Sequence, residues 1–201
     1  MAMIDKIKDI LVKPLFFFEK IQEEKGVKKA FLYFMVLAFF STLLAYLVSL
    51  VMPVYSAGVL EKLFGVTIPE SALKSPTLIL TGFYYILSLG ISFLVAGLLH
   101  VWILIFGGKA DYTKSYQLFV YSNTPSYLFG WIPFLGFFAK IYSLILLILG
   151  TEKMHDISRK RAILMYVIPM VIFSILGLIG IVLAMTALKA LPLTEMAAQF
   201  Q

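Results

Sequence analysis

Residues 30–52 read AFLYFMVLAFFSTLLAYLVSLVM, contain no charged side chain and are followed directly by Pro53. An α-helix rises about 1.5 Å per residue, so about 20 apolar residues cross the roughly 30 Å hydrocarbon layer of a bilayer. This stretch is long enough for one crossing. We therefore predict a first transmembrane helix here.

The composition of the whole chain agrees with a membrane location. Apolar residues make up 61% of the 201 positions and charged residues only 14%, whereas a soluble domain carries about 25% charged residues. The excess apolar surface is expected to face lipid. The chain has no cysteine, which excludes disulfides, thiolate metal ligands and cysteine nucleophiles.

Four further apolar stretches follow, at residues 78–106, 114–130, 133–150 and 162–188. The third and fourth come from one run, which we divide at Gly130-Trp131-Ile132-Pro133 because glycine and proline end helices and tryptophan favours the membrane interface. The sequence thus predicts an all-α integral membrane protein with five transmembrane helices. Its membrane domain covers residues 30–190, and residues 191–201 form a short exterior tail.

The distribution of basic residues gives an orientation. With five spans and a cytoplasmic N-terminus, thirteen Lys and Arg residues lie inside and only Lys62, Lys74 and Lys189 lie outside. Short cytoplasmic loops are enriched in Lys and Arg. Fusing the third and fourth spans would move the Arg159–Lys160–Arg161 cluster outside, so the same count favours five spans. We expect a multi-pass cell-membrane protein with an exterior C-terminus.

Residues 1–29 form a separate, charged N-terminal segment with helical periodicity. Its apolar residues are spaced by three or four, at Ile4, Ile7, Leu11, Leu15, Phe18 and Ile21, with charged residues between them. This pattern is typical of an amphipathic helix at a membrane surface. Pro14 should break it in two. We expect two short helices at the cytoplasmic interface, with Phe16 and Phe17 dipping into lipid.

Two ionisable residues fall within predicted spans. His100 lies in the second span, where a neutral imidazole can bond to a backbone carbonyl or a tyrosine of a neighbouring helix, or can form part of a functional site. Lys140 lies in the fourth span, close enough to the outer interface for its stem to reach the boundary. For Lys140 the alternatives are a positional role and a buried, substrate-contacting lysine.

The third span contains a second polar feature, Tyr121-Ser122-Asn123-Thr124-Pro125. Proline removes one helix hydrogen bond, and the neighbouring hydroxyls and the Asn123 amide can bond to the carbonyls that are left free. The sequence predicts a helix break here. It serves either as a kink or as part of a binding pocket.

Signatures of enzymes and of tightly bound groups are missing from the sequence. There is no H-E-x-x-H, no G-x-S-x-G and no complete phosphate-binding loop around Gly107-Gly108-Lys109. His100 and His155 are the only histidines, too few for a metal cluster by themselves. We expect no catalytic site, no cofactor, no metal and no nucleic-acid partner.

Short motifs along nearly the whole chain, from about residue 10 to 190, resemble the Yip domain family of Ypt-interacting, five-span membrane proteins. The motifs are Pro14-x-x-Phe17 with Gly26, His100 ahead of Gly107-Gly108-Lys109, Tyr121-Ser122-x-x-Pro125, Trp131-Ile132-Pro133-x-x-Gly136, Tyr142-Ser143, and Gly150-x-x-x-x-His155-x-Ile157-Ser158-x-x-x-Ala162. Their order and spacing carry the resemblance. The chain lacks the long cytoplasmic N-terminal region of eukaryotic relatives and looks more like a compact prokaryotic member.

The resemblance implies a cytoplasmic N-terminus, assembly with the same or other membrane proteins and, for eukaryotic members, Golgi or endoplasmic-reticulum membranes and small GTPases of the Rab type. On this basis we expect a non-enzymatic membrane scaffold or adaptor. The alternative is a small transporter, channel or lipid-moving protein, with His100, residues 122–125 and Lys140 along a polar route. The two hypotheses differ in whether His100, Asn123 and Lys140 face a shared cavity.

Overall fold

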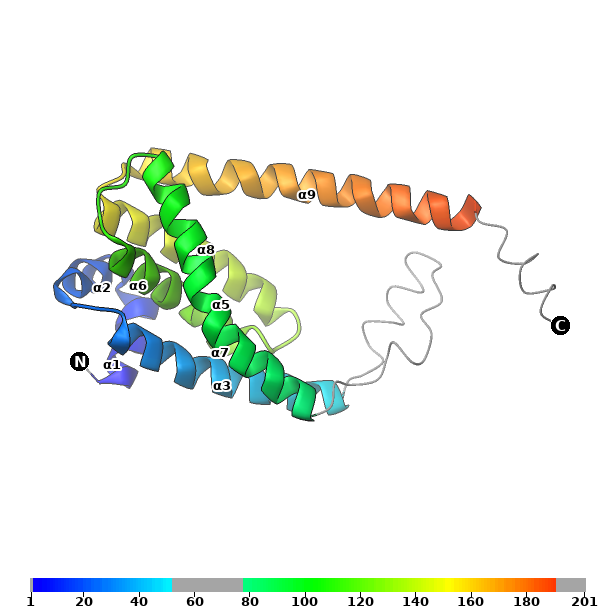
Figure 1. Cartoon of the computed structure of the whole chain (residues 1–201), viewed down its shortest axis with the longest axis horizontal. Helices are drawn as coiled ribbons and strands as arrows, with labels where there is room; N and C mark the ends of the chain where they lie inside the picture. The colour runs from blue at the N-terminus through cyan, green and yellow to red at the C-terminus, as the bar shows by residue number, and fades with distance from the viewer. Residues whose placement is uncertain (1, 52–77, 191–201) are drawn as a thin grey trace. The chain divides into compact units, whose positions relative to one another are not determined.

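The computed structural model describes residues 2–51 and 78–190, and the chain divides into two compact units, Met1–Ala162 and Ile163–Gln201. All regular structure in these described ranges is helical (Figure 1). The predicted loop between the first two spans and the exterior tail lie outside the described residues.

The elements follow one another in a simple order. They are α1 (Met3–Val12), α2 (Pro14–Lys20), the short 3₁₀ helix η1 (Ile21–Glu23), α3 (Lys28–Val51), α5 (Leu78–Ile105), α6 (Tyr112–Ser122), α7 (Thr124–Phe129), α8 (Leu135–His155) and α9 (Arg159–Ala190). Helices α3, α5, α8 and α9 match the first, second, fourth and fifth predicted spans within a few residues at most ends. Pro169 lies inside α9.

Four helices among the described residues are long and apolar enough to cross a membrane, namely α3, α5, α8 and α9. The third predicted span is present as two shorter helices, α6 and α7, of 11 and 6 residues. Each is shorter than the roughly 20 residues that a crossing needs. The break falls at Asn123, directly before the Thr124-Pro125 pair, so the interruption predicted from the proline is confirmed.

Helix α6 lies in the interior of the first unit. It contacts α3, α5 and α8, and most of its residues are buried, including Ser115, Gln117 and Tyr121. Large apolar residues of α5 and α8, such as Leu94 and Phe138, are exposed instead. This arrangement suits a membrane protein, because polar side chains meet other protein groups while the outer helices offer apolar surface to lipid.

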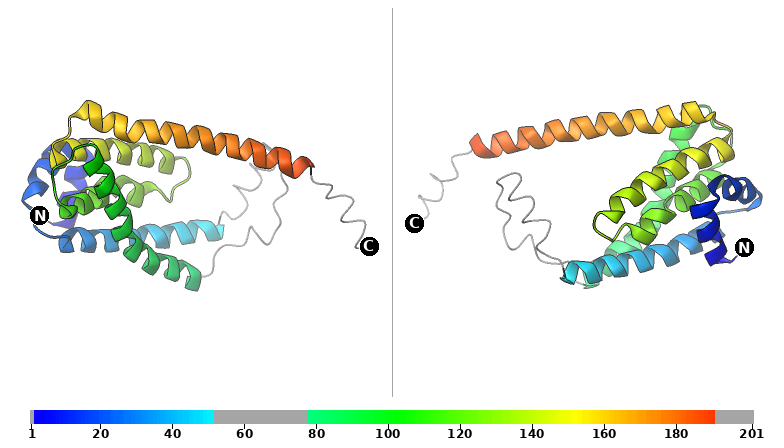
Figure 2. Two further views of the ribbon diagram at one scale, coloured as in Figure 1. Left: turned by 45° about the horizontal axis from the view of Figure 1, so that its top comes forward. Right: turned by 180° about the vertical axis from the view of Figure 1, so that it is seen from behind.

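The N-terminal segment is folded against the rest of the first unit. Pro14 occupies the first turn of α2 and separates it from α1, as predicted. Helix α2 contacts α8, and α1 contacts α2 and α7 (Figure 2). The expectation that Phe17 dips into lipid is wrong: its side chain is completely buried in the protein, whereas Phe16 is 54% exposed.

The turns between helices follow from local sequence. Helix α5 ends in a Schellman motif, in which Gly107 N donates to Leu104 O and Gly108 N to Ile103 O. Gly107 has a φ of 88°, a left-handed conformation that favours glycine. The predicted hairpin at residues 130–133 is also present, since α7 ends at Phe129, α8 begins at Leu135, and the two helices are in contact.

The second unit consists of the greater part of α9. From Met170 to Leu183 its apolar side chains are exposed on all sides of the helix, with Phe173 and Leu178 among the most exposed. An α-helix that is apolar all round is typical of a membrane span. Gly177 and Gly180 leave open space where a Cβ atom would stand.

Candidate functional site

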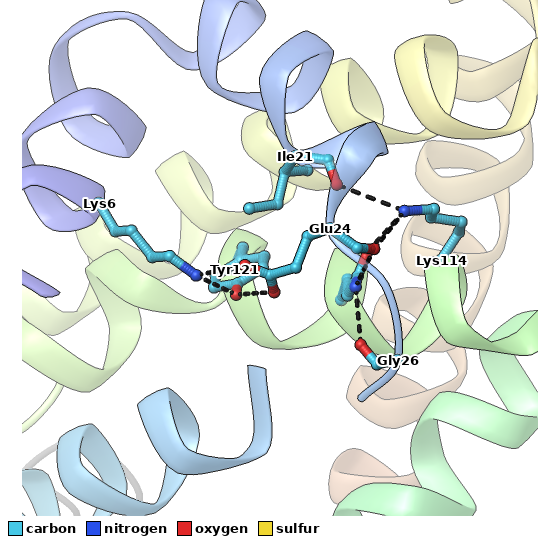
Figure 3. A network of polar contacts seen from close by, with 7 residues as sticks. Lys6, Ile21, Glu24, Gly26, Lys114 and Tyr121 are labelled. Carbon is cyan, nitrogen blue, oxygen red and sulfur yellow. Dashed lines mark hydrogen bonds and ion pairs between the residues drawn. The ribbon is translucent and has the colours of Figure 1, made fainter. Parts of the chain in front are cut away.

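Three side chains from distant parts of the chain form a closed polar triangle inside the first unit (Figure 3). The Lys6 ammonium donates to Glu24 Oε2 and to the Tyr121 hydroxyl, each at 2.7 Å, and the Tyr121 hydroxyl donates to Glu24 Oε1 at 2.7 Å. The Lys6 and Glu24 side chains are both only 8% exposed. The two charges therefore compensate each other in a nearly dry environment, as a buried ion pair requires.

A second set of contacts holds the main chain of η1 and of the residues that follow it. Lys114 Nζ donates to the carbonyls of Gln22 and Glu24 at 2.7 and 2.8 Å, and Gln117 Nε2 donates to those of Glu24 and Gly26 at 3.0 and 2.9 Å. Carbonyls at a helix end lack partners within the helix. Lys114 and Gln117, one turn apart on α6, supply them, and Figure 3 shows Lys114 pointing towards the main chain at Glu24.

Apolar packing completes the docking of the N-terminal segment. The Phe17 ring meets the Tyr121 ring edge-on, with centroids 5.2 Å apart. Phe18 lies against Gly150 of α8, where a Cβ atom would stand 2.8 Å from the Phe18 ring and 2.4 Å from Leu118. Glycine at this position is what lets α2, α6 and α8 approach so closely.

A separate chain of polar contacts connects α5, α6 and α8. His100 Nδ1 and Ser115 Oγ are 2.9 Å apart, and Ser115 Oγ and His155 Nε2 are 3.3 Å apart. Ser115 and His155 are buried, and His155 Nδ1 has no hydrogen-bond partner among the described residues. His100 thus bonds to a neighbouring helix, which is one of the two alternatives for this residue, although its partner is a serine rather than a tyrosine or a carbonyl.

The polar residues around the helix break repair it. Asn123 Nδ2 donates to Phe119 O, and the Thr124 hydroxyl donates to Tyr121 O, both at 2.8 Å. Thr124 also shares a 3.0 Å hydrogen bond with the Tyr33 hydroxyl of α3. These contacts are the ones expected where a proline removes backbone hydrogen bonds, and they fix the break against α3.

The remaining sequence candidates occupy different surroundings. Lys140 is exposed on α8, and Pro133 is exposed in the hairpin. Gly136 is buried, and a Cβ atom there would stand 2.7 Å from Gly130 O, so its role is close packing. Ser158 is exposed directly before α9. His100, Asn123 and Lys140 therefore do not meet: the first binds Ser115, the second binds its own helix and the third faces outward.

The residues that matter most for the docking were missed by the sequence analysis. The apolar face predicted to meet the membrane surface comprised Ile4, Ile7, Leu11, Leu15, Phe18 and Ile21. Ile4 is 78% exposed, but Phe18 and Ile21 are buried in the protein, and the buried face of α1 carries Lys6 and Ile10. The positions of Lys6, Ile10 and Phe17, one turn or two apart, hold the signal that could have revealed this face. A lysine on the buried face of a helix is unusual, because a buried lysine needs a partner.

The described residues contain no group of three His, Asp or Glu side chains placed to hold a metal ion. The apolar outer helices, the interrupted α6–α7 pair and the polar interior together define a helical multi-pass membrane protein. The chain belongs to the Yip1 domain family, whose model matches residues 8–184. This match confirms the family that the motifs indicated. Comparisons with curated proteins and with solved structures found no match.

Proposed function

We propose that the protein is a non-enzymatic membrane scaffold or adaptor of the Yip type, which assembles with further copies of itself in the bilayer. The observation that carries the proposal is the surface of α9. Apolar side chains surround this helix, and Gly177 and Gly180 leave open space one turn apart. Small residues on the surface of a membrane helix let a second helix approach closely.

The first unit supports the same proposal by what its polar groups do. Lys6, Glu24, Lys114 and Gln117 are used to fix the N-terminal segment, and a rigid segment at the membrane surface is a suitable platform for a protein partner. A small GTPase is one partner class that the family resemblance suggests. This role needs no chemistry at the site.

Assembly can be measured by single-molecule subunit counting in nanodiscs or lipid vesicles. Gly177→Leu combined with Gly180→Leu should convert oligomers to monomers, because the added side chains fill the space that a partner helix would use. Ile179→Phe adds bulk to another side of α9 and should leave assembly unchanged. A wild-type protein that stays monomeric at all densities tested, or equal loss in both variants, would contradict the proposal.

The proposal includes five crossings, a cytoplasmic N-terminus and an exterior C-terminus. Here α6 and α7 together make the third crossing, with the 130–134 hairpin on the exterior side. The chain has no cysteine, so single cysteines can report the side of each loop. In sealed vesicles Lys8→Cys and Lys160→Cys should react from one side and Phe134→Cys from the other. Labelling of Lys8→Cys and Lys160→Cys from opposite faces would contradict five spans.

A second candidate function is a small transporter, favoured by the hydrogen-bonded chain from His100 through Ser115 to His155. A separate cavity of about 400 Å³ lies between α3 and α5, and the hydroxyl groups of Ser41 and Thr42 are among its lining groups. Polar groups inside the membrane are what a solute or proton path requires. Proton or solute flux into liposomes that His100→Ala or Ser115→Ala abolishes would favour this candidate. Flux equal to protein-free vesicles would exclude it.

A further inference from the structure

A cavity of about 650 Å³ opens between the N-terminal segment and the first turns of α3. Its walls come from four elements: α1 contributes Met3, the end of α2 contributes Lys20, η1 contributes Glu23, and α3 contributes Lys29 and Leu32. The docking of the N-terminal segment therefore creates this cavity, which neither wall forms alone.

Five charged side chains line this cavity: two form an ion pair with each other, and three lie outside the ion pairs. Lys6 and Glu24 also line it, but they bind each other. Lys20, Glu23 and Lys29 take part in none of the ion pairs between described residues, and Lys20 Nζ lies 5.8 Å from the centroid of the Phe16 ring. Two positive charges and one negative charge leave the cavity with a net charge of +1. A ligand group with one negative charge complements it.

The positions of the lining residues along α3 indicate what else the ligand contains besides its negative charge. Lys29 lies in the first turn of α3, at the boundary where the charged N-terminal segment gives way to the uncharged span. Leu32 and Val36 follow on the same side of the helix, three and seven residues further into the span. Over about 10 Å the wall thus changes from ammonium groups to apolar side chains. A phospholipid has the same order, with its phosphate above its acyl chains.

We propose that this cavity is a binding site for an anionic phospholipid. Lys20 and Lys29 bind its phosphodiester, and the first part of one acyl chain lies along Leu32 and Val36. The lipid contacts both the end of α2 and the start of α3, so its binding stabilises the docked N-terminal segment. This site is independent of α9 and of the proposed assembly.

The test is native mass spectrometry of the purified full chain, titrated with phosphatidylglycerol in detergent. Lys20→Gln combined with Lys29→Gln should weaken retention of the first bound lipid about 30-fold, from the contribution of two lysines to binding an anionic lipid. Lys25→Gln combined with Lys28→Gln removes the same charge from neighbouring positions that do not line the cavity, and it should leave the first bound lipid in place. Equal losses in both double variants would show general surface attraction and overturn the proposal.

Three further comparisons examine the two ends of the ligand. Val36→Trp should displace the lipid while both lysines remain, because the indole fills the apolar end of the cavity. Phosphatidylcholine, which carries a phosphate but no net charge, should bind more weakly than phosphatidylglycerol. Glycerophosphoglycerol, which has the head group without chains, should not compete. Binding of phosphatidylcholine as tight as that of phosphatidylglycerol, or full competition by glycerophosphoglycerol, would overturn the proposal. Circular dichroism of each variant checks that its helices are formed.

Discussion

Replacing Lys6 with methionine should release the N-terminal segment. Methionine keeps much of the length and apolar character of the lysine stem but removes the ammonium that binds Glu24 and Tyr121 at 2.7 Å. The Glu24 carboxylate, with a side chain only 8% exposed, is then left buried and unpaired. Removing one partner of a buried ion pair costs about 3 to 5 kcal/mol. The equilibrium constant for opening the segment should therefore rise about 100- to 5,000-fold.

Hydrogen exchange of the α1 amides in nanodiscs measures this opening directly. Amides of residues 3–12 should lose protection in Lys6→Met by that factor, or exchange at the intrinsic rate if the segment detaches altogether. The double variant Lys6→Met with Glu24→Gln removes both charges and should regain most of the protection. Lys8→Met is the matched control, because Lys8 is exposed on the same helix. The reasoning fails if Lys6→Met exchanges no faster than Lys8→Met, or if the double variant exchanges as fast as Lys6→Met.

Three further predictions concern other contacts. Gly150→Ala should lower the free energy of unfolding by about 1 to 3 kcal/mol, because its Cβ atom would overlap Phe18 and Leu118. Gly90→Ala, where the space is open, should raise the thermal unfolding midpoint slightly. Equal unfolding midpoints for the two variants would contradict this. Lys114→Gln should increase hydrogen exchange of residues 21–26 without affecting α8, since it removes the charged donor to their carbonyls. The Lys109 ammonium, 2.7 Å from Asp156, holds the pKa of that carboxyl below its ordinary value of 3.8. The stability that this contact contributes is present above pH 3.8 and is lost as the pH falls through the lowered pKa. Lys109→Gln should return the pKa of Asp156 towards 3.8 in an NMR titration.

The apolar helices could be predicted from the sequence because lipid imposes a length on them. Residues 30–52, 78–106 and 162–188 correspond to α3, α5 and α9 with small differences at their ends, since a charge-free run of about 20 residues has few alternatives. The division of the third run at Gly130 and Pro133 was also confirmed. Here glycine and proline restrict the backbone directly, and no distant contact is needed to decide the outcome.

The docking of the N-terminal segment could not be predicted in the same way. Periodicity gave helices broken at Pro14, but it did not show that one face of this segment is buried against the rest of the protein. The residue that decides the face is Lys6, whose burial depends on Glu24 and Tyr121, and Tyr121 is 115 residues away. The pairing of His100 and His155 through Ser115 is similar, because three separate helices contribute to it. Such contacts have no local sequence pattern.

The contact between Lys6 and Tyr121 also constrains how the protein is made. The ribosome synthesises the N-terminal segment before α6 and α8, yet this segment packs against Tyr121 of α6 and Gly150 of α8. Until those helices have left the ribosome and entered the bilayer, Lys6 and Glu24 lack their contact with Tyr121, and Phe17 remains exposed to solvent or chaperones. The first part to be synthesised is therefore among the last to reach its native position, and it closes the first unit only after the helices inside the membrane have gathered.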